Sequence, residues 1–119
     1  MALLMTRTGL VFLVLAIICG AFGAHGLESM VTKERLETWE TAVRYQAWMS
    51  LLMVGLGVSS FQVSSWAFWL VCSGVLTFSG SLYALVLLDL DILGAVAPVG
   101  GALMIAGLLL CAIRLKRPD

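Results

Sequence analysis

The chain has 119 residues, of which 61% are hydrophobic and 12% are charged, and its formal net charge is zero. This length allows one domain, and the charged share is about half that of a typical soluble domain. Because the chain has neither a net positive charge nor a basic stripe, its composition argues against a nucleic-acid partner.

Three stretches contain no charged residue: Thr8–Leu27, Tyr45–Leu88 and Ile92–Ile113. A membrane-spanning helix needs about 20 mostly apolar residues, because an uncompensated charge is costly in hydrocarbon. The first and third stretches each fit one crossing, and the middle stretch fits two crossings joined by a turn. The sequence therefore predicts an all-α integral membrane four-helix bundle, with residues 1–119 forming a single membrane domain.

The first helix is predicted over about residues 8–24. Small residues fall on one side of it at helical pitch, which lets another backbone approach closely. These residues are Gly9, Ala16, Gly20, Gly23 and Ala24. We expect this strip to lie inside the bundle or at a contact between protomers.

The polar segment that follows predicts a short amphipathic helix over about residues 32–44, with Thr32 as its N-cap. Leu36, Trp39 and Val43 recur at i, i+3 and i+7, so they share one face, and charged residues occupy the rest. We expect this helix to lie on the membrane surface with Trp39 at headgroup level. Binding of a partner protein through the same three residues is the alternative.

Helices two and three are predicted over about residues 45–61 and 66–88. Helix three also carries a strip of small residues, which indicates either helix packing or a narrow permeation path. These residues are Ser73, Gly74, Thr77, Gly80, Ser81 and Ala84.

Helix four is predicted over about residues 92–113 and contains Pro98, which Gly100 and Gly101 follow closely. Proline lacks an amide hydrogen and crowds the carbonyl four residues earlier, so we expect a kink or an opened turn there. Such a break either fits the helix against its neighbours or exposes carbonyls to a permeating species.

Basic residues gather at both ends of the chain, with Arg7 before the first helix and three more after the last: Arg114, Lys116 and Arg117. An even number of crossings places both ends on the same side of the membrane. Since basic residues are retained on the cytoplasmic side, we expect both termini to be cytoplasmic.

Five residues are predicted to converge near the outer leaflet: His25, Arg44, Tyr45, Gln46 and Tyr83. We expect them to form a hydrogen-bond network that locks the helix ends, although His25 alone also suggests a contact to quinone or haem. The candidate packing or path residues are Gly20, Gly23, Gly80, Ser81, Pro98 and Gly101. No predicted span has an ionisable residue near its middle, and no metal-ligand or phosphate-binding motif is present. We therefore predict no catalytic residue, no metal and no cofactor.

Four segments of the chain resemble, in order, the YgdD family of small four-helix membrane proteins. They are Gly20–Gly26, Tyr45–Gln46, Phe78–Tyr83 and Pro98–Gly101. The resemblance implies a bacterial inner-membrane protein but no activity, since the family is regarded as a domain of unknown function. The family pattern has a histidine where this chain has Met49 and commonly a threonine where it has Ala97, which argues against ligation by two histidines per chain.

The leading functional hypothesis is a non-enzymatic protein that acts by association in the lipid bilayer. It would be an accessory or stabilising component of a larger membrane-protein complex, or a homo-oligomer. The alternative is a small channel or carrier for a neutral or weakly polar solute. A third hypothesis, a quinone- or haem-associated subunit, depends on His25.

Overall fold

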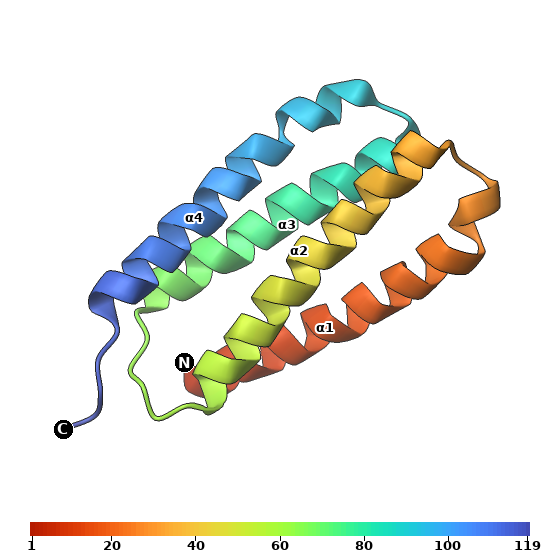
Figure 1. Cartoon of the computed structure of the whole chain (residues 1–119). Coiled ribbons are helices and arrows are strands. Elements are labelled where there is room, and N and C mark those ends of the chain that lie inside the picture. Colours follow the sequence, from red (N-terminus) through yellow and green to blue (C-terminus); the bar gives the residue numbers. More distant parts are fainter.

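The computed structural model describes residues 1–119 and contains four long helices that run antiparallel along a bundle 54 Å in length (Figure 1). The long helices are α1 (Ala2–His25), α2 (Lys33–Val58), α3 (Ser65–Leu88) and α4 (Ala97–Arg114). Two short 3₁₀ helices, η1 (Leu27–Ser29) and η2 (Asp91–Ala95), connect α1 to α2 and α3 to α4. We call the end of the bundle that carries η1 and η2 the loop end. Both termini lie at the opposite end, which we call the terminal end. The predicted all-α architecture with four long helices is confirmed.

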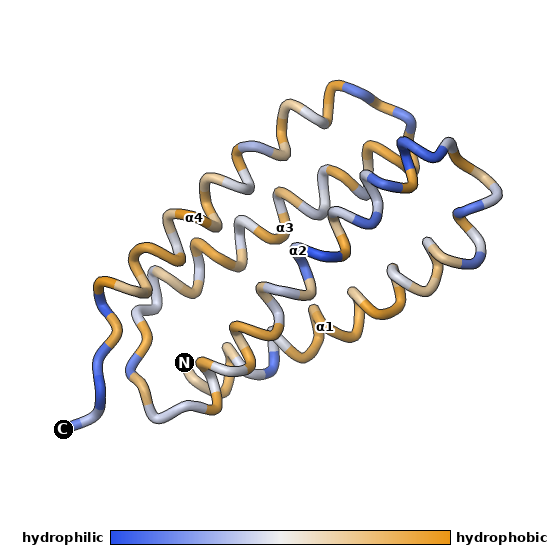
Figure 2. The backbone as a smooth tube through the Cα atoms, viewed as in Figure 1, coloured by the Kyte–Doolittle hydropathy of each residue, from blue (hydrophilic) through white to orange (hydrophobic).

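Three segments are long and apolar enough to cross a membrane: α1, α3 and the stretch Asp91–Arg114, which comprises η2 and α4. Helix α2 differs because its half nearest the loop end is hydrophilic (Figure 2). It nevertheless packs between α1 and α3, and α3 packs between α2 and α4. The resulting cross-section is flattened, at 26 × 16 Å.

Glycines bring the helix pairs α1–α2 and α3–α4 into close contact. A Cβ added at Gly9 would lie 2.8 Å from the carbonyl oxygen of Ser50, and one at Gly74 would lie 2.7 Å from the backbone nitrogen of Met104. No side chain fits in such a gap, so the backbones themselves are in contact, which is the usual route to tight packing of membrane helices. Gly9, Gly20 and Gly23 of the predicted small strip of α1 therefore face α2, whereas Ala24 is exposed.

The predicted separate amphipathic helix over residues 32–44 is wrong, because α2 runs without interruption from Lys33 to Val58. No glycine or proline precedes Gly55 in this helix, so nothing in the sequence ends it at Arg44. Trp39 is buried, and its indole N–H donates to the carbonyl of Cys19 at 2.8 Å. It therefore packs inside the bundle and does not face lipid.

The other two residues of the predicted apolar face, Leu36 and Val43, also pack against the core that Trp39 shares with α3. The i, i+3, i+7 pattern thus identified the correct face of the helix but not what covers it: the neighbouring helices of the same chain. The predicted N-cap is confirmed, since the Thr32 hydroxyl accepts from the backbone N–H of Arg35 at 3.2 Å.

The break predicted near Pro98 is present, but it precedes α4 and does not kink it. Helix α4 begins at Ala97, so Pro98 lies in its first turn, where the missing N–H breaks no intrahelical hydrogen bond. The irregularity expected there takes the form of η2, which precedes α4. Helix one likewise begins at Ala2, because an α-helix continues through a charged residue such as Arg7.

Candidate functional site

Two of the five residues predicted to converge do meet, and they connect three helices. The hydroxyl of Tyr83 on α3 donates to Oε1 of Gln46 on α2 at 2.7 Å. Nε2 of Gln46 in turn donates to the carbonyl of Phe12 on α1 at 2.7 Å. Because Gln46 is mostly buried, these bonds satisfy an amide that water does not reach.

The other three residues lie elsewhere. His25 and Arg44 are exposed, and neither forms a side-chain hydrogen bond. Tyr45 packs its ring against Trp48 and Phe78, at centroid distances of 5.0 and 4.9 Å. The structure therefore contains a polar pair, not the five-residue network.

The pair also lies near the middle of the bundle, whereas the sequence placed it at a membrane edge. The difference follows from the start of α2. With a helix that begins at Lys33, Gln46 is close to its midpoint, and its partner Phe12 is close to the midpoint of α1.

A groove of about 250 Å³ lies between α1 and α3, and Gln46 and Tyr83 form part of its lining. We call it the α1–α3 groove. Its walls are mainly apolar, and Gln46, Tyr83 and Ser79 are the residues in its lining with polar side-chain oxygen or nitrogen atoms. Gly80 opens onto the groove, since a Cβ at this position would meet no atom within 4 Å. The Ser79 hydroxyl is already engaged, donating to the carbonyl of Ala42 at 2.7 Å.

The remaining candidate packing or path residues are dispersed. A Cβ at Gly20 would lie 3.4 Å from Val43, one at Gly23 would lie 2.8 Å from the Trp39 ring, and one at Gly101 would lie 4.0 Å from the Phe78 ring. Ser81 is buried, and its hydroxyl donates to the carbonyl of Phe78 on its own helix. Gly20 and Gly23 thus contact α2 and Gly101 approaches α3, whereas Pro98 is exposed in the first turn of α4.

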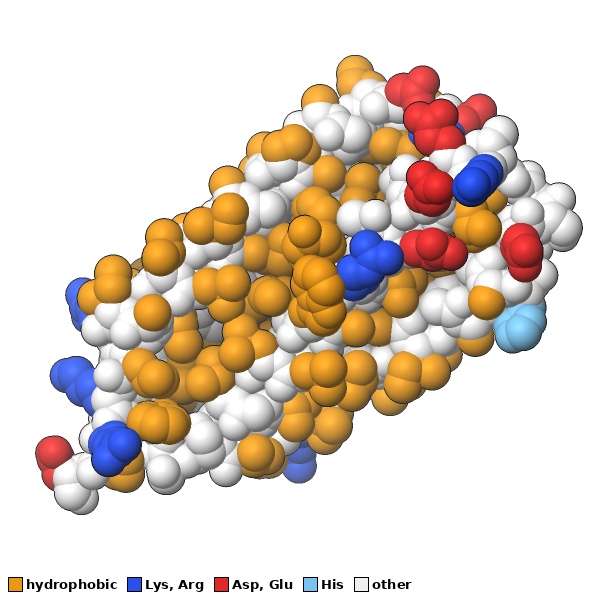
Figure 3. Space-filling model, viewed as in Figure 1, with side chains coloured by type: hydrophobic (Ala, Val, Ile, Leu, Met, Phe, Trp, Pro, Cys, Tyr) orange, Lys and Arg blue, Asp and Glu red, His pale blue; other side chains and the backbone are white.

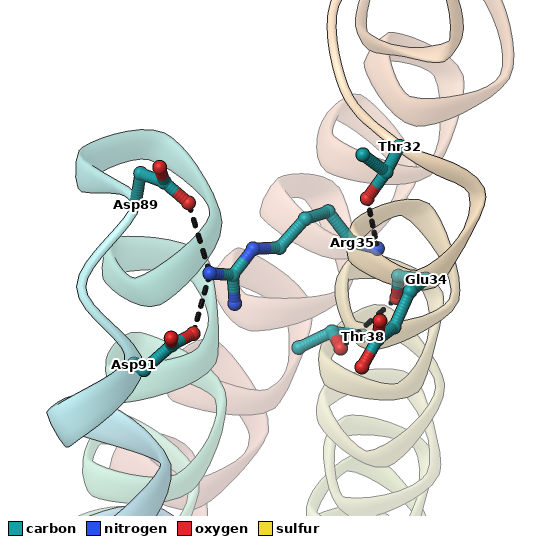
Figure 4. A network of polar contacts seen from close by, with 6 residues as sticks. All are labelled: Thr32, Glu34, Arg35, Thr38, Asp89 and Asp91. Atoms are coloured by element: carbon teal, nitrogen blue, oxygen red, sulfur yellow. Dashed lines mark hydrogen bonds and ion pairs between the residues drawn. The ribbon is translucent and has the colours of Figure 1, made fainter.

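An ionic site that sequence reasoning missed lies at the loop end (Figure 4). One guanidinium nitrogen of Arg35 reaches Oδ1 of Asp89 at 2.9 Å and Oδ1 of Asp91 at 2.5 Å. Asp89 ends α3 with a left-handed φ of 54°, a conformation that aspartate tolerates better than most residues. Because arginine remains charged in proteins, these contacts are ionic.

These two ion pairs hold the first turn of α2 against the connection between α3 and α4. Beside them is a hollow of about 660 Å³ whose lining is half hydrophobic, including Leu27, Val31 and Val86, and half polar or charged. The useful sequence signal was the pair of acidic residues in the α3–α4 turn, which an even number of crossings places at the same end as the start of α2.

A charged face runs along α2 from the loop end to the middle of the bundle. It is formed by four exposed residues that align at helical pitch: Lys33, Glu37, Glu40 and Arg44. Figure 3 shows red and blue atoms over this half of α2, bordered by hydrophobic atoms of the flanking helices. We call this surface the charged face of α2.

Four packed helices, three of them apolar enough to span a bilayer, define the class: a small α-helical membrane protein. The chain matches the family described as "Protein of unknown function (DUF423)" over residues 19–101, and it belongs to that family. No solved structure matches the chain significantly.

Several staphylococcal proteins are similar along most of their length. The UPF0382 membrane protein of Staphylococcus haemolyticus is 45% identical over 112 residues, covering 86% of this chain and 92% of the relative. That of Staphylococcus epidermidis strain RP62A is 46% identical over 103 residues, covering 83% and 84%. That of Staphylococcus aureus strain RF122 is 42% identical over 102 residues, again covering 83% and 84%.

Proposed function

We propose that this chain is a non-enzymatic, multi-pass protein of the bacterial inner membrane that acts by association. It serves either as an accessory or stabilising component of a membrane assembly or as a homo-oligomer. All four helices cross the bilayer, and both termini are cytoplasmic, as the basic residues at the terminal end favour: Arg7, Arg114, Lys116 and Arg117. The likeness to the YgdD family supports the same location.

The observation that carries this proposal is the depth of the charged face of α2. Ala42 accepts a hydrogen bond from Ser79, which lies nine residues before the end of α3. At 1.5 Å per residue, this level is roughly 14 Å from the loop end. Arg44 is two residues farther along α2, so its backbone lies well inside a hydrocarbon layer of about 30 Å.

The neighbouring helices are apolar at this depth. Leu15 and Ile18 of α1 and Leu76 of α3 are all exposed, and they suit contact with lipid chains. An arginine or aspartate at the centre of a membrane helix costs about 2.5–3.5 kcal/mol on insertion scales. Glu40 and Arg44 therefore require a polar or protein surface in front of them, and a protein partner supplies it.

Photo-crosslinking in the native membrane tests this proposal. A photoreactive residue at Trp48 lies next to the charged face, whereas the same residue at Ile17 lies on an exposed, apolar part of α1. We expect a discrete crosslinked protein species from position 48 and none from position 17. No crosslink from position 48, or the same pattern from both positions, would contradict association through α2.

A second candidate, a small channel or carrier for a neutral solute, is supported by the α1–α3 groove. Its polar pair lies at mid-depth, where a solute would need hydrogen-bonding partners. Uptake of glycerol or urea into liposomes is the test, with Gly80→Leu as the blocking variant, because the position is open to a larger side chain. Uptake that Gly80→Leu abolishes would support a carrier, and the absence of uptake would argue against one.

A further inference from the structure

We propose that the partner on the charged face of α2 is a second copy of this chain, related by a twofold axis parallel to the membrane normal. This inference rests on the proposed function and names its partner. The face carries charges of both signs, so it can complement itself: Glu37 and Glu40 are negative, and Arg44 and Lys33 are positive. In a twofold contact the same patch meets itself, so each pairing occurs twice.

Glu40 and Arg44 form the central pair of this contact. They are four residues apart, roughly 6 Å along the helix axis, a distance that an arginine side chain spans easily. Arg44 of one copy therefore reaches Glu40 of its partner, and the symmetry creates the reciprocal pair. Within one chain, both groups are free for this role, because the only ion pairs are those of Arg35 with Asp89 and Asp91.

The same face continues toward the terminal end of α2 as an apolar surface. Trp48, Leu51 and Val58 are exposed there, with Trp48 half exposed at 51%. A Cβ at Gly55 would meet nothing within 4 Å, so this part of the face has a notch where the partner helix can approach closely. The contact thus combines two ion pairs near mid-membrane with an aromatic and aliphatic half, and Trp is a residue type favoured at interface centres.

Charge reversal tests the pairing. Two copies with different affinity tags are co-expressed and purified through one tag in mild detergent, and the recovery of the second tag is measured. Glu40→Arg in both copies places two arginine side chains opposite each other at each contact, and Arg44→Glu in both copies places two glutamates there. We expect each change to reduce co-purification by at least about tenfold, since like charges across an interface are strongly unfavourable.

Two combinations separate repulsion from misfolding. Glu40→Arg and Arg44→Glu in the same chain exchange the charges, and we expect co-purification to return. A mixed pair, with Glu40→Arg on one tagged copy and Arg44→Glu on the other, is the second combination. In the mixed dimer one copy has arginine at both positions and the other has glutamate at both, so each contact joins opposite charges and we expect co-purification of the two tagged copies to return. Glu28→Arg, which reverses an exposed charge on η1 outside the charged face of α2, is the matched control and should have no effect.

The outcomes also distinguish this inference from the proposed function. If the exchange of charges within one chain does not restore co-purification, the partner is not a second copy in this arrangement. If wild-type copies do not co-purify but position 48 still crosslinks to another protein, self-association is wrong and the proposed function stands. If wild-type copies do not co-purify and position 48 yields no crosslink, both are wrong.

Discussion

Replacing Gly74 with alanine should loosen the contact between α3 and α4. The new Cβ would lie 2.6 Å from Cγ of Met104, 2.7 Å from its backbone nitrogen and 2.8 Å from the carbonyl oxygen of Gly100. The last two atoms belong to the backbone, so the clash is relieved only if the helices move apart. Overpacking of this kind costs about 1–3 kcal/mol, and a backbone contact belongs near the upper end.

Alanine also favours the helix over glycine, by about 1 kcal/mol, so the net loss expected for Gly74→Ala is about 1–2 kcal/mol. Gly80→Ala is the matched control, because it lies in the same helix with no atom within 4 Å of the new Cβ. It gains the same helical preference without a clash, so its free energy of unfolding should rise by up to about 1 kcal/mol.

The measurement is unfolding in mixed detergent micelles by titration with sodium dodecyl sulfate, followed by helical circular dichroism. The difference between the two variants isolates the clash, since the propensity change is common to both. We expect Gly74→Ala to be less stable than Gly80→Ala by about 2–3 kcal/mol. Equal stabilities would refute the idea that the α3–α4 backbones are in contact at Gly74.

Three further predictions concern the polar contacts, each read out by the same titration unless stated. Trp39→Phe removes the indole hydrogen bond to α1 and should cost about 0.5–1.5 kcal/mol, whereas Trp66→Phe, at an exposed ring, should cost nothing measurable. Gln46→Leu and Tyr83→Phe should each cost about 1 kcal/mol or less, and the double variant should cost less than their sum because the two side chains share one hydrogen bond; strict additivity would contradict the pairing. Asp91→Asn should speed hydrogen–deuterium exchange of the η2 amides by weakening the tie to α2, and unchanged exchange would show that this ion pair does not restrain the turn.

Three of the four helices could be predicted from the sequence because the absence of charge over about 20 residues is a strong and local signal. The start of α2 was missed for the opposite reason. Charged residues before Tyr45 indicated the membrane surface, whereas helix continuity depends on backbone propensity, and no helix breaker lies between Lys33 and Gly55.

The candidate site was predictable only in part. Gln46 and Tyr83 were named because buried polar side chains in apolar helices seek partners, but the acceptor at Phe12 is a backbone carbonyl that only the helix register defines. The ion pair between Arg35 and Asp91 joins residues 56 positions apart. No local pattern links them, so their contact emerges only once α2 and the α3–α4 turn are placed at the same end.

The most direct test of the account is whether the charged helix α2 crosses the membrane. Single cysteines at Met30, before α2, and at Ser60, after it, are introduced into a chain whose three native cysteines are replaced by alanine. A membrane-impermeant maleimide is then applied to intact cells. We expect Met30→Cys to react in intact cells and Ser60→Cys to react only after permeabilisation. Reaction of both positions under the same condition would place them on one side and show that α2 does not cross.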